Sequence, residues 1–297
     1  MTNARKIAGL WQVGIAGLLM TMFAWPAQAS EQTVQQPAQG VLRVCQDPNN
    51  LPFSSRDGHG FENKIAALFA ADLGWTLETM WSPQRMGFIR NTLRAKVPDS
   101  TAYKCDLATS VAFEKGGTTQ AYYRSTYAMA YLKGKGLDGV KTLDDLLALD
   151  PQQRQQLKLG VFARSPVSDW LLKHGLMEQI VSYQTQTGDP DQYPGQMLEQ
   201  DLANGKIDIA FIWGPIAGYF AQQSSSAAIV SVPLRSVPGM HFEFGIAMAV
   251  RRGDDEFKQR IDGLIVKHQS QINAILADYG VPLVDERSNL AGANGQQ

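Results

Sequence analysis

The residues from Val41 to Leu73 read VLRVCQDPNNLPFSSRDGHGFENKIAALFAADL, and this stretch sets the fold class of the chain. VLRVC contains β-branched residues and predicts a short strand. After a loop of turn-forming residues, Phe61, Ile65 and Leu68 recur at helical spacing, and Gly74 follows the end of the predicted helix. A strand that leads through a loop into a helix is the repeating unit of α/β proteins.

The loop and the first helical turn supply the first candidate binding residues. These are Asn49, Asn50, Pro52, Phe53, Phe61 and Glu62. Loops at the carboxyl end of a strand are favoured places for binding. Four of them also have a structural interpretation, because Asn49, Asn50 and Pro52 can shape a turn and a glutamate in the first turn, Glu62, is stabilised by the helix dipole.

The alternation of strand and helix continues and restarts after residue 139. The first series predicts strands at 75–81, 104–111 and 122–134 and a helix over 84–95. The second predicts strands at 157–162, 179–185 and 206–213 and helices over 165–175, 195–203 and 215–222. RVCQDP resembles GVFARSP, and KCDLA resembles KIDIA, which indicates two lobes of related topology.

The last part of the chain predicts two strands, one long helix and a polar tail. The strands are 228–234 and 242–250, and the second is an uninterrupted apolar run of the kind found in a covered sheet. The helix covers 254–280, and Gly263 is expected to bend or break it. The polar residues 286–297 are predicted to form a disordered tail.

Residues 1–29 have the pattern of an export signal. Arg5 and Lys6 precede a long apolar run, and AQA supplies a cleavage site after Ala29. We therefore predict a periplasmic protein whose mature chain does not span the membrane. The apolar run is also long enough to remain as an uncleaved anchor, which is the alternative.

Composition excludes several classes of function. The net charge is −1, with Lys and Arg interspersed among Asp and Glu, so the chain lacks the basic face that nucleic-acid binding requires. The four histidines, His59, His174, His241 and His268, are not at ligand spacing, and no protein metal site is predicted. Catalytic and dinucleotide-binding motifs are also missing, so we predict neither an enzyme nor a bound cofactor.

Cys45 and Cys105 are the two cysteines of the chain. In an oxidising compartment such a pair predicts a disulfide, which would stabilise the fold by ~4 kcal/mol. The alternative is a pair of buried free thiols, because cysteine packs well as a small apolar residue.

The layout resembles the type II periplasmic solute-binding fold, in the branch of solute-binding protein family 3 that serves polar amino acids. YYRSTYAMAYL stands where that fold crosses from lobe 1 to lobe 2, and FEFGIAMAV stands where it returns. The resemblance implies an α/β, two-lobed fold in which each lobe is a doubly wound mixed sheet flanked by helices. Lobe 1 would contain residues 40–131 and 240–285, and lobe 2 residues 132–239.

The chain departs from the amino-acid-binding members of that family at two points. Those members have an arginine for the ligand carboxylate after the strand that here reads CDLATSV, where this chain has AFEKGGTTQAYY. They have an aspartate for the ligand ammonium where this chain has Trp213, Gly214 and Pro215. An amino-acid ligand is therefore doubtful, although Arg85, Arg124 or Arg164 could supply a charge from elsewhere.

A narrower resemblance covers most of the mature chain. DPNNLPFSSRDGHGFENKIA, GVFARSPVSDWLLKHGL, DIAFIWGPIAGYFA and INAILADYGVPLV look like the quinoprotein-dehydrogenase-associated branch of this fold, the MxaJ/XoxJ type. The resemblance implies a periplasmic partner of a PQQ-dependent alcohol dehydrogenase that acts in the maturation or activation of that enzyme. It does not imply that this chain binds PQQ.

Further candidate residues follow from the crevice and the crossover of such a fold. Ser110, Ser165 and Trp213 are assigned to the crevice, and Tyr127, Tyr131 and Phe244 to the hinge. Ser165 is equally explained as a helix cap, and Trp213 as a residue packed in lobe 2. The tyrosines around the crossover pack in the hinge or, where exposed, mark a protein interface.

Three functions remain open. The first is an accessory protein that binds a PQQ-dependent dehydrogenase directly. The second is a transport receptor whose lobes close on a small polar solute and pass it to an ABC permease. The third is a periplasmic enzyme on the same scaffold.

Overall fold

The computed structural model describes residues 40–84, 86–184, 189, 191–224, 228–285, 287, 289 and 290. The predicted export signal, 1–29, lies outside the described residues, as do most residues of the predicted tail, 286–297. Within that tail, the Asn289 amide nitrogen donates to Asp285, and Leu290 forms an isolated bridge with Val284. Among the helices that the structure describes, none is both long enough and apolar enough to cross a bilayer.

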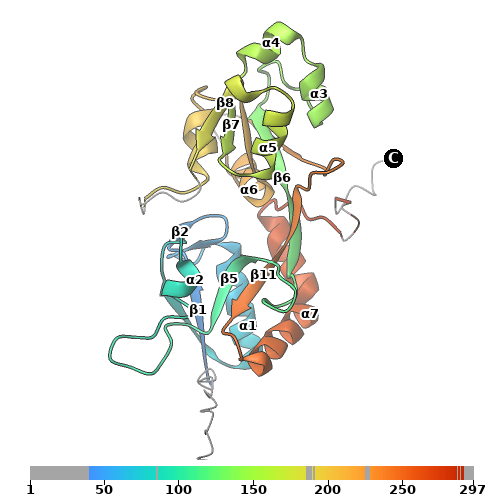
Figure 1. The fold of residues 1–297 in the computed structure, drawn as a ribbon. Coiled ribbons are helices and arrows are strands. Elements are labelled where there is room, and N and C mark those ends of the chain that lie inside the picture. Colours follow the sequence, from blue (N-terminus) through green and yellow to red (C-terminus); the bar gives the residue numbers. More distant parts are fainter. Residues whose placement is uncertain are drawn as a thin grey trace, which may run out of the picture. The chain divides into compact units, whose positions relative to one another are not determined.

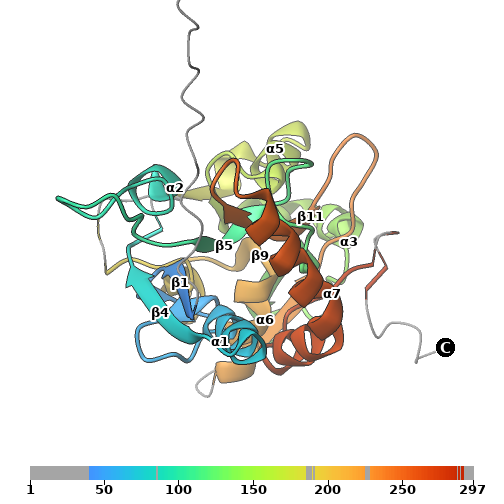
Figure 2. The ribbon, with the colours of Figure 1, turned by 90° about the horizontal axis from the view of Figure 1, so that it is seen from below.

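The first sheet contains β4 (Thr76–Trp81), β1 (Val41–Gln46), β5 (Leu107–Ala112) and β11 (Glu243–Val250), in that order. The first three strands are parallel, and β11 is antiparallel to β5. Helix α1 (Phe61–Leu73) packs against α7 (Asp255–Asp278), as Figures 1 and 2 show. A small hairpin of β2 (Asn49–Asn50) and β3 (Ser54–Ser55) lies between β1 and α1 in the chain.

The second sheet contains β8 (Ile180–Tyr183), β7 (Leu159–Phe162), β9 (Ile209–Trp213) and β10 (Ile229–Pro233), with β6 (Tyr123–Leu132) between β9 and β10. Its helices include α5 (Pro166–Lys173), α6 (Gly214–Gln223) and a π-helix, η2 (Met197–Leu202). The strand order β8-β7-β9 repeats the order β4-β1-β5 of the first sheet. The sequence echo between the two halves therefore reflects a repeated topology, and the predicted two-lobed α/β fold with mixed sheets is confirmed.

Strand β6 belongs to both sheets. Residues Tyr123–Thr126 pair with β11, whereas Tyr127–Tyr131 pair with β9. The other edge of the second part pairs with β10. The Thr126 hydroxyl, at the change of partner, donates to the carbonyl oxygen of Leu234 at 2.8 Å. The lobe boundaries at 131/132 and 239/240 remain a prediction. The change of pairing within β6 lies a few residues before the first of them, between Thr126 and Tyr127.

The sequence of β6 suits a strand covered on both faces. Ala128 and Ala130 face a core cluster that also contains Ile216 and Ala217 of α6, and their small side chains let the helix approach. The alternate residues Met129 and Tyr131 belong to a second cluster on the opposite face of the sheet. The first cluster continues into the first sheet through Phe61 and its neighbours, so the two sheets share apolar packing.

Two predicted helices differ in the structure. The helix expected over 84–95 is reduced to α2 (Phe88–Asn91). Gly87 has a left-handed backbone, and the Thr92 hydroxyl bonds back to the carbonyl oxygen of Phe88, so the helix ends after one turn. The helix around Gly263 is unbroken, and this exposed glycine has open space around it.

Two short helices between β6 and β7 were not anticipated from the sequence. They are α3 (Leu143–Ala148) and α4 (Pro151–Gln156), and each has a side-chain cap at its start. The Thr142 hydroxyl caps α3, and the Asp150 carboxylate caps α4 before Pro151.

Cys45 of β1 and Cys105, just before β5, form a disulfide with their Cα atoms 5.7 Å apart. The prediction that the two cysteines form a disulfide is therefore confirmed. Beside the disulfide, the buried Asp106 carboxylate accepts from Arg43 at 2.9 Å and from Arg251 at 2.8 Å. Two arginines on one buried carboxylate compensate its loss of hydration and fix the start of β5.

Helix α6 touches the turn that follows α7. Gly218 lies against the carbonyl group of Gly280, and a methyl group at this position would overlap that oxygen. One turn earlier, a methyl group at Gly214 would overlap the carbonyl oxygen of Thr126 and the ring of Pro282. The rings of Tyr219 and Tyr279 stack beside this contact at 5.7 Å. Two glycines in one helix therefore permit backbone contact between the second sheet's helix and the end of α7.

Replacing Gly218 with alanine is expected to lower the free energy of unfolding by roughly 1–3 kcal/mol, because the new methyl group must separate α6 from Gly280. The matched change Gly263→Ala in α7 is expected to raise it by roughly 0.5–1 kcal/mol, since nothing crowds that site and alanine favours the helix. Urea denaturation of both variants measures the two changes. A stable Gly218→Ala variant would contradict the close packing.

Candidate functional site

The loop between β1 and α1 closes over the start of the helix. The carbonyl oxygen of Pro52 accepts from the Phe61 amide at 2.9 Å, and that of Phe53 accepts from the Glu62 amide at 2.8 Å. Gly60 makes this approach possible, because a side chain there would overlap the Phe53 carbonyl. The amides that could have bound an anion at this helix N-terminus are therefore already used by the loop.

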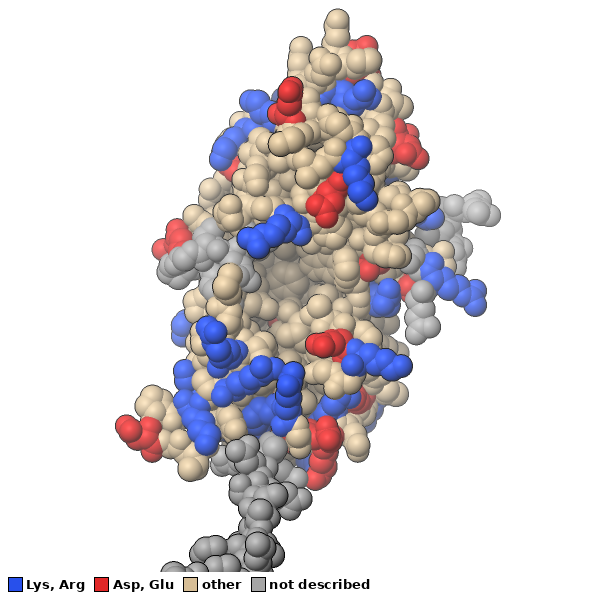
Figure 3. Space-filling view, viewed as in Figure 1, with Lys and Arg blue, Asp and Glu red and all other residues tan. Residues whose placement is uncertain are grey.

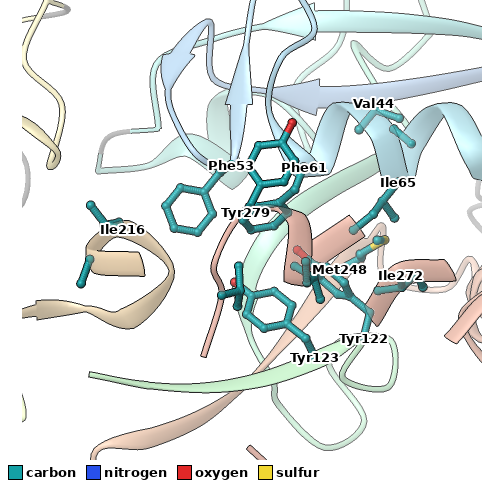
Figure 4. Close-up of a cluster of buried hydrophobic side chains, with 14 of the residues drawn as sticks. Val44, Phe53, Phe61, Ile65, Tyr122, Tyr123, Ile216, Met248, Ile272 and Tyr279 are labelled. Atoms are coloured by element: carbon teal, nitrogen blue, oxygen red, sulfur yellow. The ribbon is translucent and has the colours of Figure 1, made fainter. Parts of the chain in front are cut away.

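Three predicted crevice residues are part of the core instead. Pro52, Phe53 and Phe61 are buried, and the Phe53 and Phe61 rings meet edge to face at 5.3 Å. Phe61 also contacts Tyr123 and Tyr279, with ring centroids 5.9 and 5.8 Å away. Figure 4 draws Phe53, Phe61 and Tyr279 in one cluster with Ile216 of α6. These aromatic residues join the two sheets and do not present a binding face.

Glu62 is a buried carboxylate surrounded by hydroxyl groups. Its Oε2 accepts from Thr109 at 2.5 Å, and its Oε1 accepts from Tyr122 at 3.0 Å and from Ser110. No described basic side chain forms an ion pair with it. Burial raises the pKa of Glu62, although the three hydroxyl groups act in the opposite direction. Glu62 therefore ties α1 to β5 and to Tyr122, the residue just before β6.

A chain of hydrogen bonds connects this carboxyl group to a cavity wall. Ser110, whose hydroxyl donates to Glu62, has a left-handed backbone with φ of 54°. Its carbonyl oxygen accepts from the Gln84 side chain at 3.2 Å. The side-chain oxygen of Gln84, Oε1, in turn accepts from the Asn50 side chain at 3.3 Å. Ser110 is thus linked to Gln84, which follows β4, and through it to Asn50 of the β2–β3 hairpin. Both of these residues line the cavity, whereas Ser110 does not.

The cavity has a volume of about 580 Å³ and is lined mainly by residues that follow β8 and by η2. Figure 3 shows the surface hollowed on this side of the molecule. Its lining residues are predominantly amides and aromatic side chains. They include Asn50, Gln84, Phe162, Tyr183, Gln184, Gln192, Tyr193, Gln196, Met197, Gln200, Asp201 and Lys206.

The two charged residues among the lining residues neutralise one another. Lys206 Nζ lies 3.0 Å from Asp201 Oδ2, and the Tyr183 hydroxyl donates to the same oxygen at 2.5 Å. Partial burial acts to raise the pKa of Asp201, but Tyr183 and Lys206 lower it overall. Beside this pair, partial burial and the Glu199 carboxylate raise the pKa of Tyr193 to about 12. What the cavity wall offers to a ligand is therefore chiefly neutral hydrogen-bonding groups.

The remaining predicted residues occupy other places. Asn49 is exposed at the open end of the hairpin, where it pairs with Ser55, and Ser165 caps α5 by accepting from the Ser168 amide at 3.2 Å. Trp213, Tyr127 and Phe244 form an aromatic group where β6 changes sheets, with Tyr127 5.3 Å from Trp213. Tyr131 lies deeper in the second sheet, where its hydroxyl donates to the carbonyl oxygen of Val140.

Of the predicted crevice residues, only Asn50 lines the cavity. Arg124 and Arg164 do not line it, and Arg85 lies outside the described residues. The rule that pointed to Asn50, a polar residue just after a strand, also applies to Gln84 after β4 and to Gln184 after β8. Applied to the predicted strand 75–81 the rule reaches Gln84, but Gln184 falls inside the predicted strand 179–185 and was therefore missed. The segment 192–201 could not be assigned to the cavity in this way, because it does not directly follow a strand.

The comparisons with known proteins agree on one class. No protein-family model matches the sequence. The periplasmic binding protein XoxJ from Methylobacterium extorquens AM1 is 36% identical, with a TM-score of 0.65 over 82% of this chain and 100% of that chain. MxaJ from Methylophaga aminisulfidivorans MPT is 25% identical, with a TM-score of 0.63 over 82% and 100%. Protein MoxJ of Methylorubrum extorquens is 26% identical over 96% of this chain and 98% of its own.

These likenesses first define the class, which is a protein with the two-lobed fold of the periplasmic binding proteins. Because the match to XoxJ combines 36% identity with full coverage of that chain, the family is also established. The chain belongs to the MxaJ/XoxJ family, as the sequence motifs indicated.

Glu62→Gln tests the raised pKa of the buried carboxyl group. The folded chain holds the Glu62 proton more tightly than the unfolded chain, so the stabilisation is complete below the ordinary pKa of 4.5 and is lost as the pH rises through the raised pKa. Compared with Glu62→Gln, the wild type is therefore expected to lose stability as the pH rises above 4.5. Urea denaturation across this range measures the difference.

Glu178→Gln, which removes an exposed carboxyl group, is the control for this measurement. A difference between wild type and Glu62→Gln that stays constant across the pH range would show that Glu62 titrates normally.

Proposed function

We propose that this chain is a non-catalytic periplasmic accessory protein of a PQQ-dependent alcohol dehydrogenase, of the methanol-oxidising kind. In this proposal it binds the dehydrogenase directly and assists its maturation or activation, without a cofactor of its own. The residue pattern of 1–29 supports export, and the relatives include a periplasmic binding protein. Membership of the MxaJ/XoxJ family and its quinoprotein-dehydrogenase-associated motifs support the choice of partner.

The observation that carries the proposal is the chemistry of the cavity wall. Asp201 and Lys206, its charged lining residues, satisfy one another at 3.0 Å. A zwitterionic amino acid entering the cavity would lose hydration at both charges and would find no unpaired counter-charge among the described lining residues. Such an uncompensated transfer disfavours binding by several kcal/mol.

The same wall suits a polypeptide segment. Side-chain amides such as Gln184, Gln196 and Gln200 both donate and accept, as the backbone of an extended segment requires. Tyr183 and Tyr193 add flat apolar surface beside these amides. A segment of the dehydrogenase, rather than a free solute, is therefore the ligand that we assign to the cavity.

One observation favours a transport receptor as the second candidate. A volume of about 580 Å³ lies within the range of small-molecule sites, roughly 300–1,000 Å³. A solute at a hundredfold its dissociation constant would add ~2.7 kcal/mol of stability, which corresponds to roughly 5–10 °C in melting temperature. A shift of this size with an amino acid would support the transport receptor over the accessory protein.

Changing Gln184 and Gln200 to alanine together tests the role of the cavity. Both side chains are exposed and line the cavity, so their loss removes hydrogen-bonding groups without opening the core. We expect the double variant to bind the purified dehydrogenase at least about tenfold more weakly, a loss of about 1.4 kcal/mol. Calorimetric titration of the dehydrogenase into each variant measures the dissociation constant.

The matched control changes Gln152 and Gln156 to alanine. These glutamines are also exposed, but they lie on α4 and do not line the cavity. Equal affinities of the two double variants would argue against the cavity as the binding site. Failure of the wild-type chain to bind or to co-purify with any PQQ-dependent dehydrogenase would overturn the proposed function.

A further inference from the structure

The segment from Met86 to Lys104 forms a basic surface on a chain whose net charge is −1. Four cations and one acidic residue lie in this segment. They are Arg90, Arg94, Lys96 and Lys104, and Asp99. Figure 3 shows Lys and Arg side chains gathered on the surface over α2 and the loop that follows it. We call residues 86–104 the basic segment.

The cations of the basic segment are not neutralised within the described chain. Arg43, Lys206, Arg251 and Lys258 each form an ion pair with an aspartate, at distances of 2.7 to 3.0 Å. Three of the four cations of the basic segment have other side-chain contacts. Lys104 donates to a carbonyl oxygen at 3.2 Å, Lys96 lies 5.7 Å from the ring of Tyr103, and Arg90 contacts a side-chain amide at 3.4 Å. Their positive charge therefore remains available to a partner.

The basic segment is held firmly to the first sheet. Phe88 and Leu93 are buried in a small cluster with both cysteines of the disulfide. The Arg251 guanidinium lies 4.7 Å from the centre of the Tyr103 ring, and the Lys104 amide donates to the carbonyl oxygen of Ala95 at 3.0 Å. Charges on an anchored loop lose little conformational freedom when they meet a partner.

Exposed apolar groups and the cavity adjoin the basic segment. The Met86 side chain is 80% exposed and Val97 is 42% exposed, although both are large apolar residues. Gln84, two residues before Met86, lines the cavity. A protein that places a segment in the cavity would therefore also meet the basic segment, with apolar contacts between the charges.

We propose that the basic segment docks an acidic face of the dehydrogenase, with Arg90, Arg94 and Lys96 as its principal charges. This inference rests on the proposed function and adds the surface and the charge of the partner. A protein is favoured over a lipid surface because the basic segment follows Gln84 of the cavity wall in the chain. The amides of that wall can hydrogen-bond to a polypeptide segment, whereas a lipid bilayer supplies no such segment. Exposed charges of this kind speed the encounter of two proteins more than they prolong the complex.

The test compares two triple variants with the same change in net charge. The first is Arg90→Glu, Arg94→Glu, Lys96→Glu, which reverses three exposed charges of the basic segment. The second is Lys133→Glu, Lys135→Glu, Lys173→Glu, which reverses three exposed charges elsewhere on the chain. Association and dissociation rates with immobilised PQQ-dependent methanol dehydrogenase are measured at about 50 mM and about 300 mM salt, where screening differs strongly.

We expect the first variant to associate at least about tenfold more slowly than the second at the lower salt concentration, with dissociation changed much less. The difference should shrink at the higher salt concentration, because exposed charges are then screened. Melting temperatures of both variants, measured in parallel, show that each is folded before the rates are compared.

Each remaining outcome overturns the inference. Equal association rates of the two variants would remove the basic segment from the docking surface while leaving the proposed function intact. Wild-type binding to vesicles of phosphatidylcholine and phosphatidylglycerol that only the first variant loses, with association to the dehydrogenase unchanged, would assign the segment to a lipid surface. A wild-type chain that does not bind the dehydrogenase at either salt concentration would overturn the proposed function and this inference together.

Discussion

Strand β6 hydrogen-bonds to β11 through Tyr123–Thr126 and to β9 through Tyr127–Tyr131, and the rest of the structure depends on this change of partner. The chain passes the same point again in the segments that follow β10 and α7. The Thr126 hydroxyl and the Ser125 hydroxyl meet those returning segments, at Leu234 and at Pro282. Glycines in α6 bring its backbone against the same region. The crossing is therefore a packed junction, and any movement between the sheets has to preserve it or pivot on it.

This junction also determines where a ligand can bind. Phe53 and Phe61 are drawn into the apolar packing between the sheets, and the loop carbonyls satisfy the first amides of α1. The side of the molecule near the β1–α1 loop is thereby closed, except at Asn50. The open space lies instead against β8 and η2, where amides predominate. The buried Glu62 is linked in series to Ser110, Gln84 and Asn50, so the loop after β4 and the β2–β3 hairpin contribute a small and well-positioned part of the wall.

The architecture followed from the sequence because it depends on patterns that repeat. Apolar periodicity and the two related series of strands predicted two α/β lobes, and the resemblance to the solute-binding fold placed the crossover in YYRSTYAMAYL, which contains Tyr127. The site was harder to predict because its location depends on which side of the strand ends the core occupies. Phe61 has the same position relative to a strand in either case, and only its packing against Tyr123 and Tyr279 decides that it is buried. The one-turn length of α2 similarly depends on the backbone conformation of Gly87, which the apolar spacing of 84–95 does not report.

The basic segment begins two residues after Gln84 of the cavity wall, but the cavity and the segment act on different properties of a complex. Neutral amides form hydrogen bonds only at contact distance, so a cavity lined by them governs how long a bound segment stays. Fixed positive charges act over about a Debye length and govern how often a partner arrives in the right orientation. Steering a charged small solute requires charges in the cavity itself, whereas the cations of the basic segment are not among the residues that line it. The presence of unneutralised charges on a rigid loop beside the cavity is therefore better explained by a macromolecular partner than by a solute.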